Sequence, residues 1–419
     1  MTVCGWKIPH MVNEGEFNRL INSIKGECTM KKQSLQNKME VLEQEMNQEF
    51  KLRVNEIHGL ILAMISKTNL MLLGDPGTGK SAMLERFSRY FPNTNPDTTS
   101  IPFFKVQFTG HTKPDSIMGP VDVSIYKNES RLVTKFQNYA PNARIGMFDE
   151  FARGGQTTDL LLTLINEKEI MIDGQPYKVP MEMACGATNH DVCGDKEIAN
   201  QMFAIRDRFL QWFNPISIPL DDEDDLIAVW KHQTSPDVVN IISEDEIAQI
   251  RKESSEVILK DSTLKTFIRI LRQLRDEMGI HLSDRRTKAM MKIFQAQAWL
   301  MGHKEIEDED LIATIHCAWQ NKNDIDKVTT IVTKTIDQQL YRITQIQNRS
   351  YTEFESWVQT GKSSVNMTNQ CIQTMKDFKS ELENMKSDLK PKNETAFNQS
   401  IVILNQFITQ LSNNLLRHM

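Results

Sequence analysis

A glycine-rich turn carries the residues of this chain that are best suited to bind phosphate. It has the sequence GDPGTGKS, matches the pattern G-x-x-x-x-G-K-[ST], and lies between an apolar run and a run of helical character. Its glycines allow successive backbone N–H groups to point at one anion, and the following helix N-terminus adds partial positive charge. Lys80 would place a point charge on the β- and γ-phosphates of a nucleotide, and the hydroxyl of Ser81 would bind Mg²⁺. The predicted phosphate-binding residues are Gly74, Asp75, Pro76, Gly77, Thr78, Gly79, Lys80, Ser81 and Ala82.

Two adjacent carboxylates, Asp149 and Glu150, follow the apolar run Ile145–Phe148. In an open parallel sheet, ligands bind at the carboxyl ends of the strands, where this pair would lie. We predict that Asp149 holds the hydration shell of Mg²⁺ and that Glu150 polarises the attacking water. Such a pair alone could be a surface feature, but a phosphate-binding loop upstream, at a distance that fits a βαβ unit, favours the catalytic interpretation.

An asparagine and two pairs of arginines complete the candidate site. Asn189 follows a short apolar run at a predicted strand tip, where it could orient the lytic water or form a turn. Arg206 and Arg208 are either surface charges or the source of an arginine finger for a neighbour's γ-phosphate. Arg285 and Arg286 stand in the first turn of a predicted helix, where arginine opposes the helix dipole and needs a compensating anion such as phosphate.

The elements that must position these residues form an α/β domain with a parallel sheet and helices on both faces. Strands are expected at 70–73, 101–108, 145–148 and 183–187, and a further strand-like run ends at Phe213. Two hairpins are expected to be inserted in this domain, one pairing 121–126 with 132–136 and the other pairing 170–172 with 177–179.

Helical segments are expected on both sides of this domain. One helix should begin near Leu35 and continue past Val54 to the first strand, because its apolar residues recur every three or four positions. Beyond 328, two heptad helices joined at 390–393 predict an antiparallel hairpin. Its apolar stripe is expected to pack on itself and on the N-terminal helix, or to dock a partner.

The predicted organisation has four parts. They are an N-terminal helical segment at 1–44, the α/β nucleotide-binding domain at 45–220, an all-helical lid at 221–325, and a helical or coiled-coil appendage at 326–419.

Composition excludes several classes of protein. The net charge of −6 argues against a protein that coats nucleic acid, although a local basic channel would escape this test. No apolar run reaches membrane-spanning length, and the first residues lack the apolar core of a signal peptide. The six cysteines are scattered without zinc-ligand spacing, which favours free thiols in the cytoplasm and no structural metal.

The order of motifs over residues 45–320 resembles the AAA+ ATPases, specifically the MoxR family and its RavA-like subgroup. The likeness rests on Gly74–Ser81, Lys113–Pro120, Phe148–Glu150, Leu161–Glu167, Ala187–Asn189, Asp207–Phe209 and Ser283–Arg286. The resemblance implies that Asn189 is the sensor 1 residue and that Arg208 is the arginine finger acting on a neighbouring subunit, with Arg206 as the substitute. It also implies that Arg285 is the sensor 2 residue, with Arg286 as the runner-up. The two hairpins would be the insert in helix 2 and the hairpin before sensor 1.

The resemblance further implies a ring hexamer that hydrolyses ATP with Mg²⁺ and remodels other proteins, often with a von Willebrand A domain partner. Two departures stand out. Asp75 and Gly79 replace the Pro and Ala of many members, and no β-rich accessory domain follows the lid. The partner and client are therefore not carried over.

Three functions are compatible with these observations. The first is a chaperone-like, ATP-driven remodeller of proteins. The second is a nucleic-acid motor or nuclease-coupled NTPase, which the acidic net charge disfavours. The third is a nucleotide-dependent switch or scaffold whose helical appendage is the effector.

Overall fold

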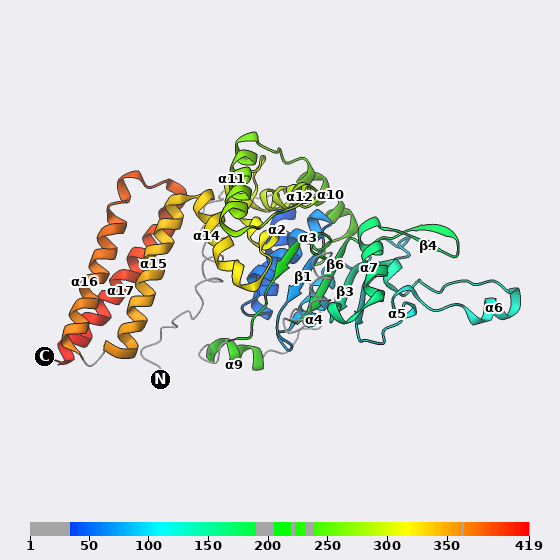
Figure 1. Ribbon diagram of the computed structural model, residues 1–419, viewed down its shortest axis with the longest axis horizontal. Helices are drawn as coiled ribbons and strands as arrows, with labels where there is room; N and C mark the ends of the chain where they lie inside the picture. Colours follow the sequence, from blue (N-terminus) through cyan, green and yellow to red (C-terminus); the bar gives the residue numbers. More distant parts are fainter. Residues whose placement is uncertain are drawn as a thin grey trace. The chain divides into compact units, whose positions relative to one another are not determined.

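The computed structural model describes residues 34–189, 205–218, 223–231, 238, 240–361 and 364–418 (Figure 1). Residues 1–33 of the predicted N-terminal segment lie outside the described residues. The chain divides into two compact units. In the described parts, the larger unit comprises residues 34–261 and 280–322, and the smaller comprises residues 262–279 and 323–418.

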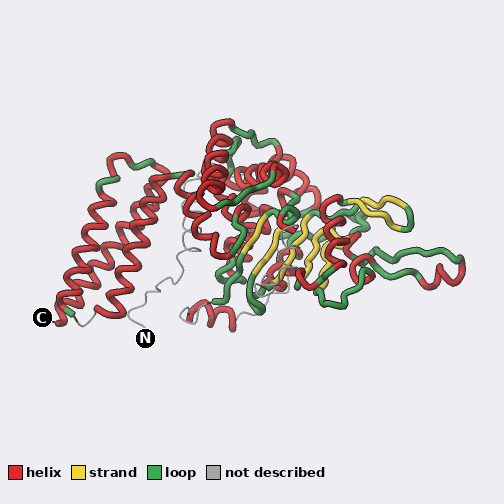
Figure 2. Tube along the Cα trace, in the orientation of Figure 1, coloured by secondary structure: helices red, strands yellow, loops and turns green. Residues whose placement is uncertain are grey.

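A five-stranded parallel sheet forms the centre of the larger unit (Figure 2). Its order is β2 (Ile101–Gln107), β3 (Ala143–Asp149), β6 (Met183–Thr188), β1 (Leu70–Leu73) and β7 (Gln211–Phe213). Strands β1 and β6 are fully buried, because helices cover both faces of a parallel sheet and leave no polar face. The predicted α/β fold is confirmed, and each strand that was expected in the sheet is present.

Helices pack on the sheet and on one another. Helix α3 (Val54–Ser66) contacts β1 and β7, and α4 (Lys80–Ser88) contacts β2 and β3. In its described parts, the other α-helices of the larger unit are α2 (Ser34–Glu49), α5 (Asp115–Met118), α6 (Val123–Glu129), α7 (Gln156–Glu167), α9 (Glu223–Lys231), α10 (Glu244–Ser255), α12 (Asp284–Met301) and α13 (Thr314–Ala318). Among the described residues, no helix is both long and apolar enough to cross a membrane.

The N-terminal helix differs from its prediction in two ways. Helices α2 and α3 are separate, because the chain turns at residues 50–53, where Leu52 has a φ of 56°. The apolar stripe of α2 packs on α3 and α12 within the larger unit, and buried His58 bonds to both Glu43 and Gln297 across this contact. Helix α2 is thus part of the larger unit's core.

The first insertion was predicted wrongly as a hairpin of two β runs. Residues 123–129 form α6, since Asp122 caps the helix by accepting hydrogen bonds from the N–H groups of Ser124 and Ile125. Strand pairing is limited to one bridge between Val121 and Thr134. Figure 1 shows α6 at the end of an arm that extends beyond the sheet.

The second insertion is the expected hairpin, formed by β4 (Glu169–Ile172) and β5 (Gln175–Lys178). Its turn, Asp173-Gly174, has positive φ at both positions, as a tight hairpin turn requires. Asp173 accepts hydrogen bonds of 3.0 Å from the N–H and the hydroxyl of Thr134, and the rings of Phe136 and Tyr177 are 4.6 Å apart. These contacts join the two insertions.

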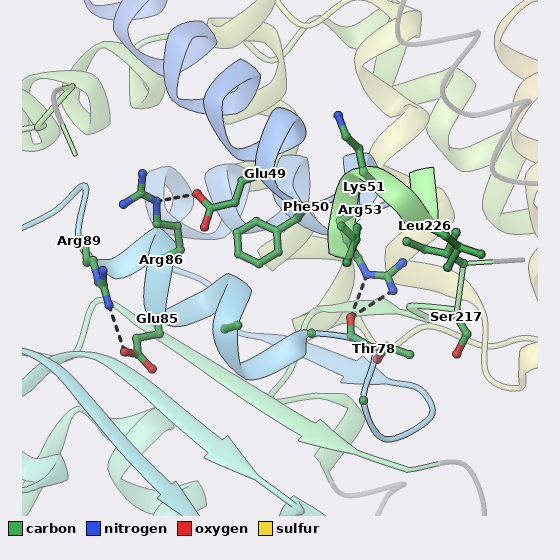
Figure 3. Close-up of a pocket in the computed structure, with 15 residues that line it drawn as sticks. Glu49, Phe50, Lys51, Arg53, Thr78, Glu85, Arg86, Arg89, Ser217 and Leu226 are labelled. Carbon is green, nitrogen blue, oxygen red and sulfur yellow. Dashed lines mark hydrogen bonds and ion pairs between the residues drawn. The ribbon is translucent and has the colours of Figure 1, made fainter. Parts of the chain in front are cut away.

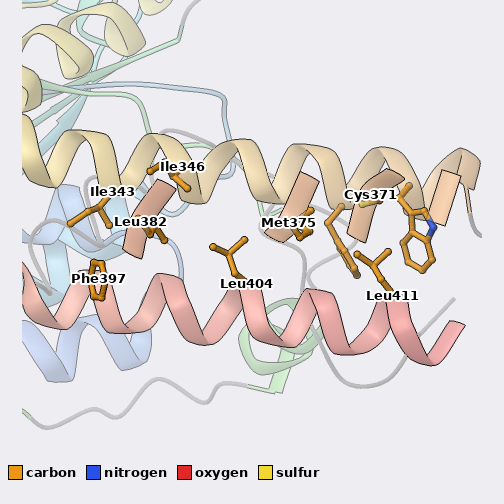
Figure 4. Close-up of a cluster of buried hydrophobic side chains, with 10 residues drawn as sticks. Ile343, Ile346, Cys371, Met375, Leu382, Phe397, Leu404 and Leu411 are labelled. Atoms are coloured by element: carbon orange, nitrogen blue, oxygen red, sulfur yellow. The ribbon is translucent and has the colours of Figure 1, made fainter. Parts of the chain in front are cut away.

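The smaller unit is helical. It contains α11 (Asp261–Met278, whose first residue belongs to the larger unit), α14 (Ile325–Ile336), α15 (Gln338–Ser356), α16 (Val365–Glu383) and α17 (Glu394–His418). Helices α16 and α17 lie side by side, as the predicted hairpin requires, and α15 packs on both to form a three-helix bundle (Figure 4). The bundle buries residues such as Ile346, Met375 and Leu404. The C-terminal stripe therefore has α15 as its partner, which the sequence did not indicate.

The close approach of α3 to β7 provides a stability test. A Cβ atom on Gly59 would lie 2.1 Å from Cζ of the buried ring of Phe213. Replacing a helical glycine by alanine ordinarily stabilises a helix by about 1 kcal/mol, but here overpacking should reverse the sign. We expect Gly59→Ala to destabilise the larger unit by about 1–3 kcal/mol.

Thermal unfolding of the full chain, followed by circular dichroism, measures this effect. Gly110→Ala is the matched control, because a Cβ atom there meets nothing within 4 Å. An unchanged or raised melting temperature in Gly59→Ala would contradict the packing of α3 on β7.

Candidate nucleotide-binding site

The glycine-rich turn joins β1 to α4 and needs glycine at three places. Gly77 and Gly79 have φ of 81° and 79°, which L side chains rarely adopt. A Cβ atom on Gly74 would lie 2.4 Å from the carbonyl oxygen of Pro215. The backbone therefore curls closely between the sheet and the segment after β7, with the N-terminus of α4 at its end.

Lys80 lies inside this loop. Its Nζ donates hydrogen bonds of 2.7 Å to the carbonyl oxygens of Gly74 and Asp75, and its side chain is buried. Burial lowers the pKa of Lys80, while the charges of Asp149 and Glu150 oppose this shift. The N–H donors of the Lys80 ammonium group therefore lie at the loop, where a phosphate would compete with the two carbonyl oxygens for them.

The two predicted metal ligands meet across the site. Ser81 Oγ donates a hydrogen bond of 2.9 Å to Asp149 Oδ2, and Asp149 Oδ1 accepts one of 2.9 Å from the N–H of Glu150. A hydroxyl and a carboxylate are hard oxygen donors, which suit Mg²⁺. Ser81 and Asp149 would hold the Mg²⁺ ion, which would neutralise charge on the phosphates.

Glu150 and Asn189 meet because β6 lies next to β3 in the sheet. Asn189 Nδ2 donates to Glu150 Oε1 at 3.2 Å, and Arg153 Nε pairs with Glu150 Oε2 at 3.2 Å. Glu150 has a φ of 52°, a left-handed conformation that is costly for this residue type and that clusters at functional sites. Arg153 was missed at the sequence level, because an arginine three residues after a carboxylate is common on surfaces.

The structure separates Arg206 from Arg208. Arg206 donates to the carbonyl oxygens of Trp319, at 2.8 Å, and Gln320, and its guanidinium stacks over Trp212 at 4.6 Å. These contacts engage Arg206 within its own chain. Arg208, half-buried two residues later, therefore remains the candidate for an arginine finger.

The structure also separates Arg285 from Arg286. Arg286 is 4% exposed and donates to the carbonyl oxygens of Cys317, Leu210 and Arg206. Its compensating acceptors are therefore backbone carbonyl groups, which corrects the expectation of an anion at this residue. Arg285 is exposed and remains the sensor 2 candidate.

A pocket of about 580 Å³ opens beside the phosphate-binding loop (Figure 3). Its walls come from the turn after α2, from the loop and α4, and from Ser217, Ile218, Leu226 and Val229 (other members of the wall are Phe50, Arg53, Thr78 and Ala82). Its volume is within the range of small-molecule sites, and apolar residues in its walls, such as Phe50 and Leu226, suit a nucleoside. Sequence reasoning missed all of its residues outside the loop, because the segments are distant in the chain and share no motif.

Fold and site together define a P-loop ATPase of the AAA+ type. The strand order β2-β3-β6-β1-β7 places the loop, the carboxylate pair and Asn189 at one edge of a parallel sheet, and a series of helices follows the sheet in the chain.

Comparison with known protein families supports the same class of protein. The family described as the MoxR domain in the MoxR-vWA-beta-propeller ternary systems matches residues 37–252, and an AAA lid domain matches residues 247–332. The first match covers more than half of the chain, so the chain belongs to the MoxR family of AAA+ ATPases. Membership implies nucleotide binding, generally with Mg²⁺.

Individual proteins are similar to this chain over much of its length. An uncharacterized protein of Methanocaldococcus jannaschii is 27% identical over 299 residues, which cover 71% of this chain and 74% of that protein. The chaperone MoxR1 of Mycobacterium tuberculosis is 22% identical over 230 residues, which cover 54% of this chain and 57% of that protein. A crystal structure from Cytophaga hutchinsonii, provisionally assigned as an ATPase, has a TM-score of 0.55 at 19% identity and covers 72% of this chain and 94% of that one. This last likeness concerns the fold alone.

Proposed function

We propose that the chain hydrolyses ATP with Mg²⁺ and uses the energy to remodel partner proteins as a ring hexamer in the cytoplasm. The observation that carries the ATPase proposal is the convergence of three elements. Lys80 and Ser81 begin α4, Asp149 and Glu150 end β3, and Asn189 follows β6, with the Ser81–Asp149 and Asn189–Glu150 hydrogen bonds joining them.

Each residue has a role in this proposal. The loop N–H groups and Lys80 bind the β- and γ-phosphates, and Ser81 and Asp149 hold the metal. Glu150 accepts a proton from the attacking water, which Asn189 helps to orient. Arg285 contacts the γ-phosphate from the lid, and Arg208 of a neighbouring subunit stabilises the charge that develops in the transition state.

The remodelling proposal is supported by the two joined insertions. They expose apolar side chains at Val123, Tyr126, Leu132 and Met171, which could contact an apolar segment of a client. The family description names von Willebrand A and β-propeller proteins as components of the same systems, so we propose a von Willebrand A protein as the partner. The finer placement in the RavA-like subgroup rests on the sequence motifs alone.

The proposal is tested by phosphate release and by the mass of the assembly. The purified chain should release phosphate from ATP in the presence of Mg²⁺, and analytical ultracentrifugation with a slowly hydrolysed ATP analogue should show six subunits. A monomer that hydrolyses ATP at full rate would contradict the ring. Absence of Mg²⁺-dependent hydrolysis in every assembly state would contradict the ATPase.

Arg208→Ala is expected to lower the rate of hydrolysis by on the order of 10³, as loss of an arginine finger does in other NTPases. If the finger acts on a neighbour, mixing Arg208→Ala with Glu150→Gln subunits should restore hydrolysis, because each Glu150→Gln subunit supplies Arg208 to a neighbour with an intact Glu150. Phosphate release of the mixture against the two separate variants measures this. A mixture no more active than its components would contradict a finger acting between subunits.

A further inference from the structure

The turn between α2 and α3 enters the nucleotide pocket. Phe50, Lys51 and Arg53 from this turn line the pocket with Glu49, the last residue of α2 (Figure 3). Two contacts attach α2 to α4 and to the turn that follows α4. Arg86 Nε pairs with Glu49 Oε2 at 2.9 Å, with both side chains almost fully buried, and the Tyr90 hydroxyl donates to Glu45 Oε2 at 2.8 Å. The turn is therefore held firmly against the phosphate-binding loop.

Arg53 makes the direct contact with the loop. Its Nε and Nη2 donate to the carbonyl oxygen of Thr78 at 3.2 and 3.1 Å, and Nη2 also donates to that of Ile216 at 2.5 Å. Its Nη1 donates to the carbonyl oxygen of Leu52 at 2.7 Å. Only 5% of Arg53 is exposed, so this guanidinium joins three segments of the pocket wall from within. The planar fork of arginine suits such a set of acceptors, whereas the single ammonium of lysine does not.

The bond to Thr78 has a consequence for phosphate binding. A trans peptide is planar, so its C=O and N–H groups point in opposite directions. Two donors on the Thr78 carbonyl oxygen therefore turn the N–H of Gly79 away from Arg53. Gly79 has a φ of 79°, and as a glycine it has no side chain whose packing could hold this conformation. The Thr78–Gly79 peptide is therefore restrained from outside, by the hydrogen bonds from Arg53.

We propose that Arg53 is a positioning residue for the phosphate-binding loop, holding the Thr78–Gly79 peptide in the orientation that presents its N–H to phosphate. This inference rests on the proposed nucleotide site. The turn after α2, which belongs to no motif of the sequence, would thus contribute to the affinity for nucleotide.

The test is the binding of ADP and of inorganic tripolyphosphate to the full chain with Arg53→Gln, measured by calorimetry and by the rise in melting temperature that each ligand causes. Because the substitution removes hydrogen bonds from a charged donor, it should lower the affinity for both ligands by about tenfold or more. Arg53→Lys, which keeps the charge but not the planar fork, should lower both affinities equally. Arg251→Gln is the matched control, because Arg251 is also a largely buried guanidinium that donates to a carbonyl oxygen, that of Met64, but it lies outside the nucleotide pocket. It should lower the melting temperature of the free protein and leave both affinities unchanged.

Three results would overturn the proposal. Wild-type affinity in Arg53→Gln would show that Arg53 only stabilises the fold. Full recovery in Arg53→Lys would show that charge alone matters. Weakened ADP binding with unchanged tripolyphosphate binding would place the effect on the nucleoside side of the pocket. Failure of the nucleotide site itself is recognised separately, since wild type and Lys80→Ala would then bind ADP equally.

Discussion

Glu150→Gln is expected to bind ATP as tightly as wild type and to lose hydrolysis by about 10²–10⁴-fold, the usual contribution of a general base. Glutamine keeps the shape of the side chain and can still contact Asn189, which bonds to Glu150 Oε1 at 3.2 Å, but it cannot accept the proton of the attacking water. Phosphate release and the dissociation constant for ATP with Mg²⁺ measure the two effects separately.

Glu256→Gln is the matched control, because it makes the same carboxylate-to-carboxamide change at an exposed residue at the end of α10. This variant should hydrolyse ATP normally. Hydrolysis at the wild-type rate in Glu150→Gln would contradict the assignment of the base. Loss of ATP binding in this variant would show that Glu150 acts in binding and not in the chemical step.

The same variant should stall with its client attached. A pull-down with Glu150→Gln in the presence of ATP, followed by mass spectrometry, should retain a stoichiometric protein that Lys80→Ala does not retain. Nuclease-sensitive material without such a protein would instead favour the nucleic-acid motor.

Lys80→Ala is expected to weaken ATP binding by about 100-fold and to abolish hydrolysis at ordinary ATP concentrations. The change removes a charged donor that lies inside the loop, and each such bond contributes about 1.5–3 kcal/mol. Calorimetric titration with ATP and Mg²⁺ measures the loss.

The matched control for this change is Lys292→Ala, which removes an exposed lysine of α12 outside the pocket. Its affinity for ATP should equal that of wild type. Equal affinities in Lys80→Ala and wild type would show that the nucleotide binds elsewhere in the chain.

The sequence by itself determined the strands of the sheet and the position of the glycine-rich loop. The groups that form the loop are contiguous from Gly74 to Ser81, and the strands beside it are buried apolar runs. Backbone conformation and burial depend there on neighbours in the chain, so residue types and their spacing were sufficient. The Asp149–Glu150 pair was found for the same reason, since it directly follows an apolar strand.

The first insertion shows where local pattern was misleading. Residues 121–126 alternate apolar and polar types, which is typical of a strand, yet they begin a helix at Val123. A strand needs a partner for its backbone groups, and only one bridge forms here. The cap at Asp122 satisfies the first N–H groups of a helix without any partner strand, so the helix forms instead.

Only the tertiary structure decided which arginines are engaged by backbone carbonyl groups of their own chain. Arg285 and Arg286 are adjacent and chemically alike, but one position on a helix points to solvent and the next points to the carbonyl groups of Cys317 and Leu210. Arg53 lies far from the loop in sequence and reaches Thr78 only after α2 packs against α4. Contacts of this kind depend on segments that are distant in the chain, because a guanidinium takes its role from the acceptors around it, and folding alone supplies those acceptors.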